Sequence, residues 1–218
     1  MGDTAAGTRI CLKGGRAEII EKRSRFIAEA APVKSEEEAA AFIERVRKEN
    51  RDARHNCYAY VTGPDGQTEK CSDDGEPSRT AGLPILNQIR GRNLKDVCVV
   101  VTRYFGGILL GTGGLSRAYG SAAAAGLDAS VTAEQRQGVR LSVSLDYELY
   151  GKVRYLAEQE GWHTAGETFG ADVSVTLLIP AEEAEGAEKK ITELCAGRNR
   201  VTEKTETFYC TDGTNVIY

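Results

Sequence analysis

A glycine-rich run between two apolar segments carries the strongest chemical signal in this sequence. The run follows a segment typical of a strand, residues 97–102, and precedes one typical of a helix, residues 116–125. Glycine is favoured where the backbone needs a positive φ or where another group approaches it closely. The N-terminus of a helix attracts anions. We therefore predict an anion-facing loop at the glycines of the run, Gly106, Gly107, Gly111, Gly113 and Gly114.

The two standard nucleotide-binding motifs do not match this run. A dinucleotide fingerprint requires a third glycine where Ser116 stands. Gly106 and Gly111 have the first spacing of a phosphate-binding P-loop, but Thr112 stands where that motif needs lysine. Two other interpretations stay open: a small-molecule kinase of the GHMP type, and a turn that only lets the helix pack closely.

Three side chains beside strand-like runs could contact the same anion. Arg103 and Tyr104 follow the run that ends at Thr102, and His55 precedes another strand-like run, residues 56–62. Arginine binds phosphate with two hydrogen bonds, tyrosine stacks on a base, and histidine binds phosphate or acts as a general base. An ion pair, a half-buried ring and a structural histidine remain the alternatives.

A short acidic segment offers a different chemistry. Asp73, Asp74 and Glu76 place three carboxylates within four residues. They could hold a magnesium ion. They could equally cap the helix expected after them, or pair with Arg54 and Arg103. We predict this acidic loop as part of the site, without assigning it a metal.

Composition bounds the function classes. The chain has 218 residues, of which 41% are hydrophobic and 28% are charged, as in soluble globular proteins. No apolar run approaches the ~20 residues that span a bilayer, and residues 1–13 lack the apolar core of a signal peptide. The six cysteines are irregularly spaced without a Cys-x-x-Cys pair. We expect a cytoplasmic protein with free thiols, no membrane contact, no metal and no cofactor.

Charge is divided unevenly along the chain. Residues 1–130 carry 19 Lys and Arg against 17 Asp and Glu, whereas residues 131–218 carry 9 against 15. The whole chain has a net charge of −4. This balance is not that of a strongly basic nucleic-acid binder, and we expect no readout of DNA sequence. It leaves room for a local basic face on the first half.

Periodicity predicts two domains. Ser35 and Glu38 form a capping box ahead of an amphipathic helix. After residue 133 the order becomes β-α-β-β-α-β, which is the ferredoxin-like unit. We therefore predict an α+β protein with a first domain at 1–133, a ferredoxin-like domain at 134–210 and a flexible tail at 211–218.

The ordered motifs together resemble the IMPACT family in its bacterial, YigZ-type form. The resemblance covers about residues 17–128 and extends to the small C-terminal domain through residues 150–153 and 160–162. The matching segments of the first domain are Lys22 to Ala28, Arg54 to Tyr60, Ser72 to Ser78, Arg103 to Gly107, Gly111 to Leu115, and Arg117 to Tyr119.

The resemblance implies a first domain of the ribosomal-protein-S-five second-domain type and a second domain similar to the fifth domain of elongation factor G. It also implies a role in regulating translation, through contact with RNA, the ribosome or a translation-associated protein. Arg117 joins the predicted anion-binding residues through its matching motif. Arg79 stands where the family usually has glycine, and Leu109 stands where many members carry lysine.

We therefore predict a non-enzymatic regulator of translation. His55, Arg103, Tyr104, Arg117 and the glycine run would bind RNA or another phosphate-bearing partner. The alternative is a magnesium-dependent or kinase-like enzyme acting on a phosphorylated small molecule, with the acidic loop at its centre.

Overall fold

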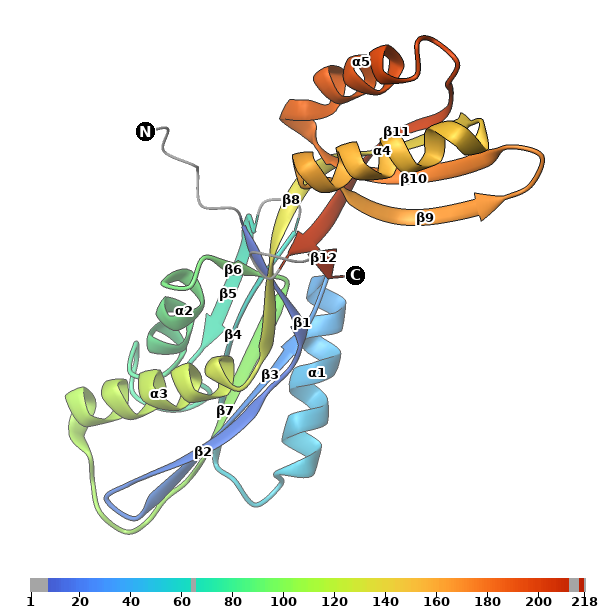
Figure 1. The fold of residues 1–218 in the computed structure, drawn as a ribbon. Coiled ribbons are helices and arrows are strands. Elements are labelled where there is room, and N and C mark those ends of the chain that lie inside the picture. Colours follow the sequence, from blue (N-terminus) through green and yellow to red (C-terminus); the bar gives the residue numbers. More distant parts are fainter. Residues whose placement is uncertain (1–7, 64–65, 212–215, 218) are drawn as a thin grey trace, which may run out of the picture. The chain divides into compact units, whose positions relative to one another are not determined.

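The chain folds into two compact units. The computed structural model describes residues 8–63, 66–211 and 216–217. The first unit comprises residues 1–134 and the second comprises residues 135–218 (Figure 1). The division lies one residue after the predicted position 133.

A five-stranded sheet forms the centre of the first unit. Its strand order is β2-β3-β7-β4-β5, and each neighbouring pair is antiparallel. The strands are β2 (Arg16–Glu21), β3 (Ser24–Pro32), β4 (His55–Thr62), β5 (Thr68–Ser72) and β7 (Val97–Tyr104).

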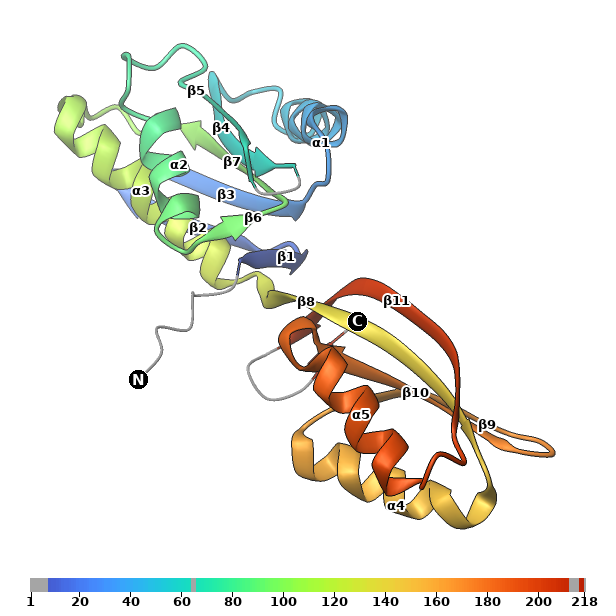
Figure 2. The ribbon, with the colours of Figure 1, turned by 90° about the horizontal axis from the view of Figure 1, so that it is seen from above.

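Helices cover both faces of this sheet. Helix α1 (Glu36–Glu49) lies on one face, and α2 (Gly82–Arg90) with α3 (Gly111–Asp128) lies on the other (Figure 2). Because side chains alternate along a strand, the central strand β7 must be apolar on both sides. It is buried from Val97 to Arg103. The apolar run that the sequence showed here is therefore a strand buried between two layers.

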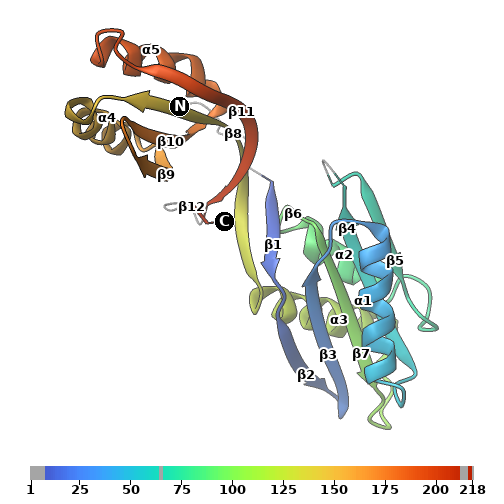
Figure 3. The ribbon, with the colours of Figure 1, turned by 90° about the vertical axis from the view of Figure 1, so that its right-hand side faces the viewer.

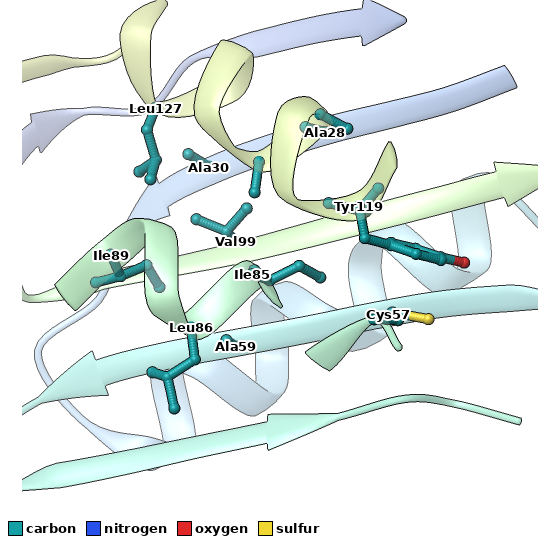
Figure 4. Packing of buried hydrophobic residues seen from close by; sticks show 14 of the residues in the cluster. Ala28, Ala30, Cys57, Ala59, Ile85, Leu86, Ile89, Val99, Tyr119 and Leu127 are labelled. Atoms are coloured by element: carbon teal, nitrogen blue, oxygen red, sulfur yellow. The ribbon is translucent and has the colours of Figure 1, made fainter. Parts of the chain in front are cut away.

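The face under α2 and α3 holds the larger core of the first unit. Tyr119 of α3 and Phe26 of β3 are fully buried, with ring centroids 5.1 Å apart in an edge-to-face arrangement. Ile85 and Ile89 of α2 pack in the same cluster (Figure 4). These contacts hold the middle of α3 against β3 and α2.

A smaller set of strands completes the first unit. Strand β1 (Arg9–Lys13) pairs in parallel with β6 (Leu94–Lys95) and antiparallel with residues 131–134 of β8 (Val131–Leu145) (Figure 3). The sequence did not predict β1, because five residues carry little periodicity and both of its partners lie far along the chain.

The second unit has the predicted ferredoxin-like order. Its strands pair as β11-β8-β10-β9, with a helix after the first strand and another after the third. Its own core is formed by residues of β8, β10 and both helices. Its further elements are α4 (Tyr147–Glu160), β9 (His163–Phe169), β10 (Val173–Pro180), the 3-10 turn Ala181–Glu183, α5 (Ala184–Leu194), β11 (Arg200–Thr211) and β12 (Val216–Ile217).

The predicted α+β class with two domains is confirmed. Of the predicted tail 211–218, Thr211 ends β11, and β12 pairs with the end of β11. Residues 212–215 and 218 lie outside the described residues.

Candidate functional site

The sheet register brings the predicted side chains of two distant segments together. His55 is the first residue of β4 and lies opposite Arg103 of β7. Arg103 in turn lies opposite Phe26 of β3, and Tyr104 lies opposite Arg25. Three neighbouring strands therefore present their side chains at one end of the sheet.

The glycine run is partly loop and partly helix. Helix α3 begins at Gly111 and not at the predicted residue 116, so Gly113 and Gly114 lie in its first turn. Gly107 and Gly111 have φ values of 83° and 71°, which only glycine adopts without strain. A side chain at Gly106 would meet the carbonyl carbon of Arg23 at 2.0 Å. The glycines thus let the loop turn and press against the neighbouring hairpin.

The hairpin beside Gly106 is basic. Lys22 and Arg23 form the turn between β2 and β3, both with positive φ, as in a two-residue type I′ turn. Their side chains are exposed, and neither has a carboxylate partner among the described residues. The buried Ser24 hydroxyl accepts a hydrogen bond from the Gly106 N–H at 3.2 Å, which joins the hairpin to the loop.

Asp73 of the acidic loop caps α2. One carboxylate oxygen accepts from the N–H groups of Ala81 and Gly82 at 2.9 Å, and the other accepts from the Arg79 N–H at 2.7 Å. Burial alone would raise the pKa of Asp73, but these donors outweigh it and lower the pKa from its usual 3.8. The carboxylate is therefore ionised and occupied by the backbone.

Asp74 links the acidic loop to β4 and α1. Its carboxylate accepts from the Asn56 N–H at 2.7 Å and forms an ion pair with Arg47 at 2.9 Å. Its carbonyl oxygen lies 2.9 Å from Nδ1 of His55. Because a carbonyl only accepts, Nδ1 carries the proton and Nε2 of the neutral ring is an acceptor.

Glu76 is the buried partner of Arg103. Their ion pair is 2.7 Å long, and the two side chains are 4% and 8% exposed. The Tyr119 hydroxyl donates to the same Glu76 oxygen at 2.8 Å. Burial, together with the neighbouring Cys57 and Glu76, raises the pKa of Tyr119, so the hydroxyl stays protonated. All three carboxylates of the acidic loop therefore have protein partners.

The partners of these carboxylates can be compared with the magnesium site that the acidic loop could have formed. Across residues 8–63, 66–211 and 216–217, no three His, Cys, Asp or Glu side chains are grouped as a metal site would require. The three carboxylates position a helix, a strand and an arginine. Their density in the sequence has a structural cause.

A hollow of about 580 Å³ lies at the sheet end that holds His55 and Arg103. Arg54 on its rim is exposed and has no carboxylate partner in the described part of the chain. Arg103 is compensated by Glu76, yet its buried Nε has no hydrogen-bond partner within the described residues. We call this hollow the strand-end cavity; its lining is Asp52, Arg54, His55, Arg103, Tyr104, Phe105 and Leu109.

Exposed apolar and aromatic groups stand on the rim of the strand-end cavity. Phe105 is 54% exposed and Leu109 is 83% exposed. The Arg103 guanidinium lies 5.5 Å from the centroid of the Phe105 ring. The Tyr104 ring has the Arg25 guanidinium 5.6 Å from its centroid, and its hydroxyl donates to the Asn50 side chain at 3.0 Å. These rings are held in place while part of their surface faces solvent.

The structure separates Arg117 from this group. Arg117 lies in the second turn of α3 and lines a different hollow, between α2 and α3. The glycines of the run do not line the strand-end cavity; they shape the loop that carries Phe105 and Leu109. The sequence interpretation missed Phe105 as a site residue. Its position directly after Tyr104 was the available signal.

Together the fold and these residues define a two-domain α+β protein with a hollow at one sheet end that is lined by arginine and aromatic side chains and by Asp52. Family models agree with the two units. A model described as the Impact N-terminal domain matches residues 22–127, and one described as a domain of unknown function (DUF1949) matches residues 143–198.

Relatives cover nearly the whole chain. The IMPACT family member YvyE of Bacillus subtilis is 37% identical, over 90% of this chain and 90% of its own length. The IMPACT family member YigZ of Escherichia coli is 36% identical, over 81% and 87%. A solved structure titled as a hypothetical protein is 34% identical, covers 90% of this chain and 96% of its own, and superposes with a TM-score of 0.58.

The chain belongs to the IMPACT family, which confirms the resemblance that its motifs indicated. None of the helices formed by the described residues has the length and apolar character needed to cross a bilayer.

Proposed function

We propose that this protein is a non-enzymatic regulator of translation that binds RNA through the strand-end cavity. One observation carries the RNA-binding part. The cavity joins an arginine without a carboxylate partner among the described residues, Arg54, to the exposed ring of Phe105 and the half-buried ring of Tyr104. The translational part rests on the membership of the IMPACT family and on what that resemblance implies.

The chemistry of the cavity matches an unpaired nucleotide. Arg54 supplies charge and hydrogen bonds for a phosphate, and the rings of Tyr104 and Phe105 supply flat surfaces for a base. Stacking on one aromatic ring contributes about 1–3 kcal/mol per base and tolerates any sequence. We therefore expect single-stranded RNA to bind with little base preference.

The observation that suggested the alternative, enzymatic function has another explanation. It relied on Asp73, Asp74 and Glu76 as metal ligands or acid-base groups. In the structure these carboxylates accept hydrogen bonds from backbone N–H groups and form ion pairs with Arg47 and Arg103. Freeing any of them would leave a buried donor or a buried charge unpaired, at a cost of about 1–3 kcal/mol or more.

Binding of labelled single-stranded RNA to the full chain at low and moderate salt tests the proposal. Because phosphate contacts release counterions, affinity must fall steeply as salt rises. Phe105→Ala and Arg54→Gln should each weaken binding, and Arg54→Gln alone should also reduce the salt slope. Arg103 is unsuitable for this test because its removal would leave the buried Glu76 carboxylate without its ion-pair partner.

Matched controls separate binding from folding. Phe105→Tyr keeps the ring and should bind as the parent does. Lys34→Gln removes an exposed charge just before α1, at the opposite end of that helix from Asn50 and the strand-end cavity, and should leave the affinity nearly unchanged. RNA binding that is absent, or that ignores both salt and Phe105→Ala, would exclude the strand-end cavity as an RNA site. A translation-associated protein would then be the partner to seek.

A further inference from the structure

A second hollow, of about 450 Å³, lies in the first unit between α2 and α3. Arg79, just before α2, and Arg117 of α3 both line it, and its lining contains no carboxylate. Neither guanidinium has an ion-pair partner within the described residues. We call this hollow the α2–α3 groove; its lining includes Arg79, Pro84, Asn87, Gln88, Arg117 and Gly120.

The backbone holds Arg79 at the rim of the groove in an unfavourable conformation. Its φ is 63°, in the left-handed region that favours glycine. Its N–H donates to the Asp73 carboxylate at 2.7 Å, which fixes this geometry. A long cationic side chain thus stands at a position whose backbone suits glycine better.

Arg117 reaches the same groove from α3. One of its terminal nitrogens lies 3.7 Å from where a Cβ at Gly113 would stand, so the guanidinium extends over the first turn of the helix. The absence of a side chain at Gly113 keeps this space open. Two cations from different elements therefore face one hollow.

Gln88 adds a polar group to the lining of the groove. The Gln88 side-chain oxygen accepts from Arg92 at 2.9 Å, and its amide nitrogen lies 3.7 Å from the Cβ position of Gly120. This orientation turns the N–H donors of Gln88 toward the groove, where Gly120 leaves room. Amide donors in the same hollow as two guanidinium groups suit the oxygens of a phosphate better than an apolar ligand.

We propose that the α2–α3 groove binds a backbone phosphate of the same RNA strand that enters the strand-end cavity. This inference rests on the proposed function. Leu109 lines the cavity and Ser116 lines the groove. Two steps of loop lead from Leu109 to Gly111, and the first turns of α3 then rise roughly 7.5 Å to Ser116 at ~1.5 Å per residue. One single strand passing the N-terminus of α3 contacts both hollows.

The test compares a trinucleotide with a single strand of about 12 nucleotides, near the upper range of single-strand binding sites. Binding is measured for the parent and for full-length variants with Arg79→Gly, Arg117→Gln or both substitutions. Arg79→Gly suits the backbone at this position, so folding is preserved. We expect the double variant to lose affinity for the long strand and to lower its salt slope by about 0.7, the value for one lost phosphate contact on a single strand. Trinucleotide affinity should not change.

Two controls make the result specific. Arg79→Lys keeps the charge at the same position and should retain most of the slope. Lys34→Gln removes a charge elsewhere in the unit and should not lower the slope. If the parent binds RNA but the double variant keeps the parent slope, the groove takes no phosphate, although the strand-end cavity stands. If the parent binds no RNA at all, both proposals fail.

The same variants test an acidic peptide as the alternative ligand of the α2–α3 groove. An acidic peptide that binds the parent and not the double variant, with the RNA slope unchanged, would overturn the phosphate assignment in favour of a protein partner.

Discussion

Asp73 accepts hydrogen bonds from three backbone N–H groups where α2 begins. The residue ahead of α2, Ala81, provides no side-chain cap of its own. Asp73, eight residues before Ala81, therefore caps the N-terminus of α2 in place of a local N-cap side chain. It also holds Arg79 in its left-handed conformation.

Asp73→Ala should destabilise the protein by about 1–2 kcal/mol at pH 7, in the upper range for a lost helix cap. The pKa of Asp73 is lowered in the folded state, so its stabilisation is full above the usual value of 3.8 and is lost as pH falls through the folded pKa. Urea unfolding at several pH values measures this effect. The gap between variant and parent should narrow below pH 3.8; a constant gap would contradict the role of the charge.

Glu76→Gln should cost more, because it leaves Arg103 charged and buried without its partner. Loss of one member of a buried ion pair typically costs about 3–5 kcal/mol. Glu69→Gln is the matched control, since its pair with Arg90 is half exposed and should contribute under ~1 kcal/mol. Denaturant midpoints of the two variants give the comparison. Equal losses would mean that the Glu76–Arg103 pair is not effectively buried.

At the scale of elements, the capping residues at helix ends predicted the structure well, because their partners lie within a few residues of them. The Ser35 hydroxyl does accept from the Glu38 N–H at 3.3 Å, as the capping box predicts. The Glu38 carboxylate returns to the N–H of Lys34 at 2.7 Å, one residue before the expected donor. Helix α4 ends at Gly161, whose φ of 73° is the left-handed cap that the glycine predicts.

Signals that depend on distant partners were not readable from the sequence. Five glycines predicted a loop to residue 115, but α3 begins at Gly111 because Leu115, Ala118 and Tyr119 pack on the sheet and support its first turns. The tasks of Asp73 and Glu76 depend on donors that only the fold brings near. The sequence therefore located the acidic loop and offered a helix cap and a pair with Arg103 as alternatives to a metal site, but it could not decide between them; the structure shows the cap and the pair.

Gly106 and Gly107 should respond very differently to alanine. At Gly106 a Cβ would meet the backbone carbonyl of Arg23 at 2.0–2.1 Å, so the loop or the hairpin must move. We expect Gly106→Ala to destabilise by about 2–3 kcal/mol, the upper range for overpacking, and to weaken RNA binding. Gly107→Ala meets no atom within 4 Å and should cost only about 1 kcal/mol of backbone strain.

Thermal unfolding and RNA titration of both variants check this contrast. If Gly106→Ala kept full stability and affinity, the close contact between the loop and the Lys22–Arg23 turn would not be needed to form the strand-end cavity.

At the scale of the whole molecule, each unit has a core of its own. Ile85 belongs to the larger cluster of the first unit and Ile191 to the cluster of the second, and both are fully buried. The residues proposed to bind RNA all lie in the first unit. The second half of the chain is acidic, with 15 Asp and Glu against 9 Lys and Arg, and does not offer RNA a favourable charge.

Conservative substitutions in the two cores should therefore act on different properties. Ile85→Val and Ile191→Val each remove one buried methyl group at a cost of about 1 kcal/mol. Calorimetry should show two unfolding transitions, with Ile85→Val lowering one midpoint and Ile191→Val lowering the other. RNA binding followed on heating should be lost with the transition that Ile85→Val shifts, because that unit contains the strand-end cavity. A single transition moved by both variants would mean that the two cores unfold together, and binding lost with the Ile191→Val transition would place the RNA site in the second unit.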